Sequence, residues 1–253
     1  MHFSGLILAS LATGAVAAPT SNVFNDVYNF DSNLEEFYSR VSAHIGRYAN
    51  GPSSTPDMSK VSLPSSSLPA PTGTLKYVAV GRGTQNYTCA DSTADAVPTL
   101  IGAVANLYDA SCVAANFPDL LDLITDIVLN YSLPSANVQT SMPPANLDLL
   151  GHHYFETATE PAFNLNTTPD KQLGIALTAK RNSTAAPSGS VPGQFNVGYG
   201  AVPWLYLTSV TGTTDGYTAV YRVKTAGGAA PSTCAGQPAA FQVQYSGQYF
   251  IYA

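Results

Sequence analysis

The stretch from Val202 to Cys234 constrains the fold most strongly, because it predicts a β-hairpin. Two runs of β-branched and aromatic residues, Pro203–Val210 and Tyr217–Thr225, are joined by Thr-Gly-Thr-Thr-Asp-Gly. Glycine and aspartate in such a loop supply the positive-φ positions that a hairpin turn requires. This stretch also contains the only tryptophan and a Gly-Gly turn, so we expect any binding site to lie beside it.

Further short strands are predicted in the first half of the chain. Leu75–Val80 and Thr84–Cys89 are rich in β-favouring residues, and Gly81-Arg-Gly83 between them is predicted to form a turn. The apolar run Thr99–Tyr108 is compatible with a strand or with a short helix.

The second half of the chain shows the alternation that is typical of half-buried strands. Leu173, Ile175, Leu177 and Ala179 alternate with small or polar residues, and Phe241–Tyr245 follows the same rule. Gly247 is expected to mark a bulge, and the aromatic C-terminus is expected to lie within the sheet. Together these strands predict a mainly β protein, an antiparallel sandwich or barrel with one or two short helices.

Two segments have the periodicity of amphipathic helices. Ser32 and Glu35 form a capping box, and apolar residues follow at helical spacing at Leu34, Phe37, Tyr38, Val41, Ile45 and Tyr48. A second helix is predicted from Asn116-Phe-Pro118, with its apolar face formed by Leu120, Leu121, Ile124, Ile127 and Val128. Asp119, Asp122 and Asp126 line its other side, which we interpret as a solvated face rather than a cation site.

The N-terminus predicts export. An apolar run from Leu6 to Leu11 precedes Ala15-Val16-Ala17, which fits the cleavage rule for signal peptides. We therefore expect a signal peptide at 1–17, a helical arm at 18–49, a Pro/Ser-rich linker at 50–73 and a β-rich domain at 74–253. No apolar run is long enough to span a membrane, so the product is expected to be secreted, outside the cell or in its wall.

The composition agrees with an extracellular glycoprotein. Charged residues are 10% of the chain, about 25% being usual, and the formal net charge is −6. Because nucleic-acid binding needs a basic surface, a nucleic-acid partner is not expected. Glycosylation sequons occur at Asn86, Asn130, Asn166 and Asn182.

The motifs along the β-rich region resemble those of a family of secreted fungal and bacterial proteins whose function is not established. Automatic labelling often describes its fungal members as malate dehydrogenase. The matching segments are Gly81–Cys89, Gly151–Tyr154, Val202–Leu205, Tyr221–Pro231, Cys234 and Gln244–Phe250. The resemblance covers roughly 68–253 and brings no agreed catalytic residues; the family pattern has Asn at the position of Lys224 and an aromatic residue, often Trp, near Phe163.

The chain has three cysteines, an odd number for a secreted protein, which indicates one disulfide and one remaining thiol. The resemblance implies that Cys89 pairs with Cys234 and that Cys112 is left over. We expect Cys112 to be buried and inert, since free cysteine behaves as a small hydrophobe. The alternatives are an intermolecular disulfide and a reactive thiol.

The dehydrogenase label finds little support in the residues. Gly81-Arg-Gly83 follows a strand, but the dinucleotide fingerprint also needs a helix whose N-terminus faces the pyrophosphate. The following residues, Thr84–Cys89, favour a strand instead. No cofactor is therefore expected. No zinc motif occurs either, and His152 and His153 would face opposite sides of a strand, so no metal is expected.

Two functions remain as hypotheses. The preferred one is a non-enzymatic binding module for a glycan or a small apolar or aromatic ligand, with Trp204, Arg222, Lys224 and Tyr245 as the ligand-binding residues. This hypothesis places Arg222 and Lys224 on the same face of their strand, whereas Trp204 on its own is more typical of a core residue. The alternative is a secreted hydrolase of carbohydrate or ester substrates, with His153, Glu156 and Glu160 as the candidate catalytic residues.

Overall fold

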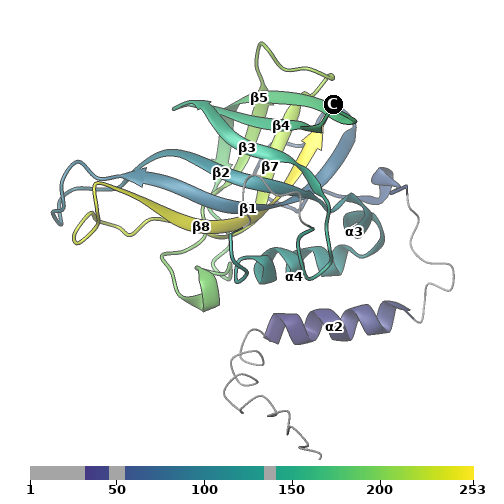
Figure 1. Ribbon diagram of the computed structural model, residues 1–253, viewed down its shortest axis with the longest axis horizontal. Coiled ribbons are helices and arrows are strands. Elements are labelled where there is room, and N and C mark those ends of the chain that lie inside the picture. Colours follow the sequence, from purple (N-terminus) through teal and green to yellow (C-terminus); the bar gives the residue numbers. More distant parts are fainter. Residues whose placement is uncertain (1–31, 46–54, 134–140) are drawn as a thin grey trace, which may run out of the picture.

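Eight antiparallel strands close into a barrel in the computed structural model, which describes residues 32–45, 55–133 and 141–253. Each strand pairs with its neighbours in the sequence, and the last strand pairs with the first (Figure 1). The strands are β1 (Leu75–Thr88), β2 (Thr99–Asp109), β3 (Leu149–Thr157), β4 (Glu160–Thr168), β5 (Lys171–Thr184), β6 (Trp204–Ser209), β7 (Ala219–Gly227) and β8 (Ala240–Tyr252). The predicted β fold is confirmed, and the architecture is a barrel.

The predicted turn at Gly81-Arg82-Gly83 is wrong, because β1 runs through it as one strand of 14 residues. The two glycines serve close approach rather than chain reversal. A β-carbon on Gly81 would lie 2.4 Å from the ring of Tyr249, and one on Gly83 would lie 2.5 Å from the Cα of Ala105. Glycine thus leaves room for the Tyr249 ring in the narrow barrel.

The hairpin and the C-terminal strand are confirmed. β6 pairs with β7 as predicted, and Gly212, Asp215 and Gly216 in their connection have positive φ. β8 pairs with both β1 and β7, so the C-terminus lies within the sheet. The expected bulge is also present, with its extra residue on the partner strand: Lys224 and Thr225 of β7 lie opposite Gly247.

The helices cover one outer face of the barrel (Figure 1). α3 (Ser111–Asn116) and α4 (Pro118–Val128) follow β2, and the predicted apolar face of α4 is buried. α2 (Ser32–Ile45) packs on α4 from outside, with Phe37 buried, whereas Tyr38 is 54% exposed and does not belong to the apolar stripe. Thr99–Tyr108, which the sequence left as either a strand or a short helix, is a strand.

The predicted half-buried strand is β5, and its buried face carries the small residues. Gly174, Ala176 and Thr178 are the buried residues, whereas Leu173, Ile175 and Leu177 are only half-buried. Ala176 pairs with Phe163 of β4, whose ring fills the barrel. The small residues of β5 face the interior of the barrel, because aromatic side chains from other strands already fill that space.

Residues 55–73, most of the predicted Pro/Ser-rich linker, pack against the barrel. They contain a 3₁₀ turn at Met58–Lys60, Leu68 is buried in the core, and the Tyr221 hydroxyl donates to the carbonyl oxygen of Pro69 at 3.0 Å. The predicted signal peptide and the rest of the segment before α2, residues 1–31, lie outside the described residues. Within the described residues, no helix is both long and apolar enough to cross a membrane.

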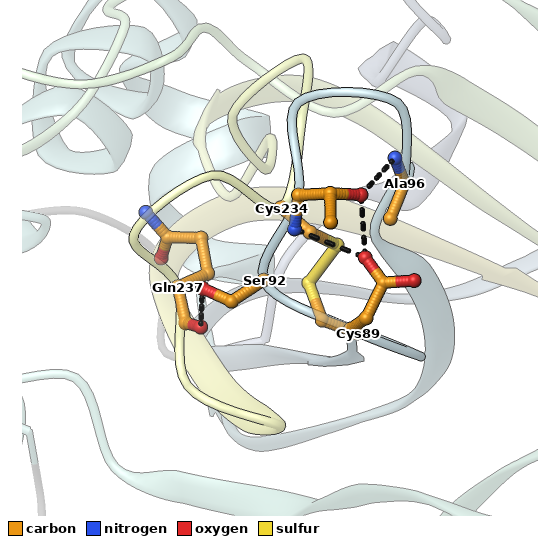
Figure 2. The surroundings of a disulfide bond; sticks show 7 residues. Cys89, Ser92, Ala96, Cys234 and Gln237 are labelled. Carbon is orange, nitrogen blue, oxygen red and sulfur yellow. Dashed lines mark hydrogen bonds between the residues drawn. A yellow bond between two sulfur atoms is a disulfide. The ribbon is translucent and has the colours of Figure 1, made fainter.

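The Cys89–Cys234 disulfide is confirmed. It joins the end of β1 to the segment that precedes β8, and Figure 2 shows the two loops bonded around it. The amide of Cys234 donates to the carbonyl oxygen of Ala96 at 2.8 Å, and the Ser92 hydroxyl donates to that of Gln237 at 3.3 Å. The prediction of a buried Cys112 is wrong: it is exposed, because it lies on the outer side of α3.

Candidate functional site

A cavity of about 570 Å³ occupies one end of the barrel, a volume within the usual range for small-molecule sites. It opens at the end where β1, β3, β5 and β7 finish and the other strands begin. Its wall is formed by Gln85, Leu100, His153, Phe155, Ala158, Thr159, Pro161, Phe163, Ala179, Lys180, Ser183, Pro203, Leu205, Leu207, Arg222 and Tyr249. The wall is therefore mostly apolar, with a few polar groups.

Arg222 of β7 projects into the barrel and is 6% exposed. Its Nη2 donates to the carbonyl oxygen of Pro203 at 2.9 Å, and its guanidinium interacts with the Tyr249 hydroxyl. The guanidinium carbon lies 6.0 Å from the ring centroid of Tyr245, a cation–π distance. Among the described groups, Arg222 Nε and Gln85 Nε2 are buried polar atoms with no hydrogen-bond partner.

His153 is buried in the same wall. Its Nδ1 lies 2.9 Å from the carbonyl oxygen of Ala162, and its ring stacks on Phe163 with centroids 4.4 Å apart. Burial lowers the pKa of His153 to about 4, and the nearby charge of Arg222 acts in the same direction. The imidazole is therefore neutral at pH 7.

Two tyrosines complete the polar part of the interior. The hydroxyls of Tyr245 and Tyr249 lie 2.7 Å apart, deep in the barrel. Burial raises the pKa of both phenols, and the charge of Arg222 offsets only part of that rise. Both hydroxyls therefore stay protonated and can donate a hydrogen bond.

The cavity wall contains cations but no carboxylate. Arg222 lies inside and Lys180 lies at the exposed rim, while none of the described residues that line the cavity is aspartate or glutamate. This differs from the molecule as a whole, which has a formal net charge of −6. Across the described part of the chain, no cluster of three histidine, cysteine or carboxylate side chains could hold a metal ion.

The structure separates the four predicted ligand-binding residues into two pairs. Arg222 and Tyr245 meet inside the barrel, whereas Trp204 and Lys224 lie outside it, beside α4. Trp204 belongs to the core between barrel and helices, and Lys224 Nζ lies 2.7 Å from Asp122 Oδ2.

The prediction that Arg222 and Lys224 share a face is wrong for a backbone reason. Lys224 has φ +48° and begins the bulge opposite Gly247, which reverses the alternation of side chains along β7. The same ion pair shows that Asp122 is not simply solvated: it accepts from Lys224 and, at 2.8 Å, from the amide of Gln248.

The candidate catalytic residues do not come together in the cavity. Glu156 and Glu160 lie at the connection between β3 and β4, and neither side chain lines the cavity. His152 faces away from His153, as expected, with its Nδ1 2.9 Å from Oδ1 of Asn106. Only His153 of the three reaches the interior.

Sequence reasoning missed several cavity residues. Gln85, Phe155, Phe163 and Tyr249 line the cavity, but the sequence assigned none of them to a binding site. Their alternation marks one face of a strand, but only barrel closure decides which face lies inside. No local signal identifies them.

Three of the four sequons lie in hydrogen-bonded positions. Oδ1 of Asn86 accepts from the Thr84 hydroxyl, that of Asn130 from the amide of Phe195, and that of Asn166 from the amide of Gly174. Asn182 of β5 is exposed. Its side chain is thus the most accessible of the four acceptors.

Comparison with protein families finds two matches along the chain. A family described as "Protein of unknown function (DUF3455)" matches residues 69–253, which is well over half of the chain and includes the complete barrel. The chain belongs to this family. A second family, "Protein of unknown function (DUF2990)", matches residues 9–69, so the DUF3455 region begins where that match ends. No curated protein and no solved structure matches the chain.

Proposed function

We propose that the barrel is a non-enzymatic binding module that takes a small molecule with an apolar, aromatic body into its cavity. The observation that supports this most directly is the cavity of about 570 Å³, lined by Phe155, Phe163, Leu205 and Leu207 and by a small set of polar groups. Small-molecule sites combine an apolar wall with a few polar groups in this way. A mostly apolar wall favours an aromatic ligand over a glycan.

The hydrolase alternative has less support. Glycoside hydrolysis requires two carboxyl groups on either side of the scissile bond. Glu156 and Glu160 lie outside the cavity wall, and His153 is neutral and hydrogen-bonded within it. A ligand in the cavity would therefore meet donors and aromatic rings, but no acid–base pair.

Export is the second part of the proposal. A buried disulfide persists in oxidising compartments, and Cys89–Cys234 agrees with the apolar N-terminal run and its small-residue cleavage site. We place the protein outside the cell or in its wall, with a glycan on the exposed Asn182. The glycan would stand near Lys180 and Ser183 at the mouth of the cavity.

The binding proposal is tested with a panel of small aromatic compounds, by thermal shift and equilibrium dialysis. We expect several compounds to stabilise the protein. Leu205→Trp, which places a larger side chain in the cavity beside Arg222, should weaken their binding at least tenfold. Trp204→Phe is the matched control, because it changes an aromatic residue outside the barrel and should leave binding unchanged. Mass spectrometry of each compound after incubation detects any chemical conversion.

The proposal fails if no compound binds, or if Leu205→Trp binds as tightly as the wild type. Conversion of a compound that Leu205→Trp abolishes would instead support an enzyme.

A further inference from the structure

The cavity contains a buried cation, Arg222, and no carboxylate is among the described residues that line it. Taking the proposed function as its basis, we propose that the ligand is a monoanion, a small aromatic carboxylate whose carboxylate group pairs with Arg222 while its ring lies against the apolar wall. This names the chemistry of the ligand, which the volume and the apolar lining alone leave open.

A buried charge costs free energy unless it is paired or well hydrogen-bonded. The ion pairs among the described residues lie on the surface, such as Lys224 with Asp122 and Arg40 with Glu36. Arg222 has a carbonyl, a phenol and an aromatic face as neighbours, and its Nε has no partner among the described groups. A ligand carboxylate would provide the missing countercharge.

A second buried arginine, Arg82, has its charge compensated by hydrogen bonds to backbone carbonyl oxygens. Arg82 of β1 points out of the barrel and donates to the carbonyl oxygens of Val128, Leu129 and Tyr131 at 2.9–3.0 Å. These carbonyls carry the partial negative charge of a helix C-terminus. Arg82 is therefore satisfied by the chain itself, whereas Arg222 faces a cavity.

The charges of the cavity wall also favour an anion. Lys180 at the rim and Arg222 inside are both positive, and the described lining has no acidic residue. A cavity with one sign of charge and apolar walls concentrates ligands of the opposite sign. In a chain with a net charge of −6, this distribution is local to the cavity.

A carboxylate fits the donors better than a phosphate does. A planar guanidinium forms paired hydrogen bonds with a planar carboxylate, and the unpartnered amide nitrogen of Gln85 and the Tyr249 hydroxyl supply further donors in the same wall. His153 is neutral, so Arg222 is the single charge among the described residues of the barrel interior. One buried cation balances a monoanion and would leave a dianion with an uncompensated charge.

Two probes of one shape separate the charge from the apolar body: naphthalene-2-carboxylate and naphthalene-2-carboxamide. Their affinities are measured at pH 7 by isothermal titration calorimetry. We expect the wild-type protein to bind the carboxylate at least tenfold more tightly than the carboxamide. Arg222→Gln should lose this preference and still bind the carboxamide.

Lys224→Gln is the matched control, because it removes a cation two residues further along β7 but outside the barrel. It should keep the full preference for the carboxylate. Gln85→Glu is an independent variant that places a negative charge in the wall. It should weaken carboxylate binding at least tenfold and change carboxamide binding less than threefold, which keeps the test decisive if Arg222→Gln does not fold.

The outcomes distinguish the two proposals. Equal affinity of the wild type for both probes, or a preference that survives in Arg222→Gln or in Gln85→Glu, overturns the anion inference but leaves a binding barrel. Binding of neither probe at millimolar concentration contradicts the proposed function itself.

Discussion

His153 and Phe163 stack inside the barrel wall, and the burial of the imidazole makes the protein sensitive to acid. In the folded protein the pKa of His153 is about 4, against 6.5 as its ordinary value. The folded state therefore binds fewer protons than the unfolded state between these two values. Stability is fully present above pH 6.5 and falls as the pH drops towards 4, by about 3 kcal/mol in total.

We predict that His153→Asn reduces this acid sensitivity. An asparagine amide can keep the hydrogen bond to the carbonyl oxygen of Ala162, but it does not titrate. The variant should be less stable at pH 7, because it loses the stacking on Phe163. Its free energy of unfolding should then fall less than that of the wild type between pH 7 and 4, as measured by urea denaturation.

Acidic groups on the surface are common to both proteins and cancel in this comparison. Hydrogen bonds lower the pKa values of Asp57 and Asp91, so these carboxylates contribute to acid unfolding at still lower pH. Parallel curves for wild type and variant between pH 7 and 4 would show that His153 is protonated in the folded state without cost, contrary to the prediction.

At the level of elements, Arg82 connects the barrel to α4. Its guanidinium donates to the carbonyl oxygens of Val128 and Leu129 at the end of the helix. It also donates to the carbonyl oxygen of Tyr131 and to the side-chain oxygen of Gln244. Burial lowers the pKa of Arg82 to about 10, which leaves it charged at pH 7. The residue thus replaces a conventional helix C-cap.

Arg82→Met is predicted to destabilise the protein by about 3 kcal/mol, because several buried carbonyl oxygens would lose their donor. Hydrogen exchange should accelerate first in α4. Arg181→Met is the matched control: Arg181 is exposed on β5 and donates to the Thr208 hydroxyl, so its loss should change stability by less than about 0.5 kcal/mol. Equal effects of the two substitutions would refute a capping role for Arg82.

Elements set by local patterns were predictable from the sequence, whereas features set by contacts between distant strands were not. The hairpin β6–β7, the helix α4 and the β-rich class follow from local periodicity and turn residues, and all three were predicted correctly. The predicted turn within β1 was wrong, because Gly81 and Gly83 make room for Tyr249 and Ala105 on other strands. Arg82 likewise meets a helix end 46 residues further on.

The candidate site was predictable only in part for the same reason. The sequence assigned Trp204, Arg222, Lys224 and Tyr245 to one site, and the structure brings only Arg222 and Tyr245 together. Simple alternation placed Lys224 on the same face as Arg222. The bulge that sends Lys224 to α4 depends on pairing with β8, which no property of residues 222–224 reveals. Gln85, on the first strand, reaches the cavity only because the barrel closes.

At the scale of the whole molecule, the barrel is closed by the pairing of its first and last strands. β1 and β8 share a ladder that runs from Leu75 with Tyr252 to Thr88 with Ala240. The N-terminal region that matches the second family reaches the helical face outside the barrel, where Arg40 of α2 meets Asp119 of α4 at 3.2 Å. The cavity lies at the same end of the barrel as the Cys89–Cys234 disulfide.

The disulfide should stabilise the molecule mainly by restricting the unfolded chain, since Cys89 and Cys234 are separated by 145 residues. We predict that the double substitution of both cysteines by serine lowers the free energy of unfolding by about 2 to 5 kcal/mol. Cys112→Ser, at an exposed thiol, should change it by less than about 0.5 kcal/mol. Urea denaturation followed by the fluorescence of Trp204, the only tryptophan, measures all three proteins. A double variant as stable as the wild type would show that the β1–β8 ladder alone holds the barrel closed.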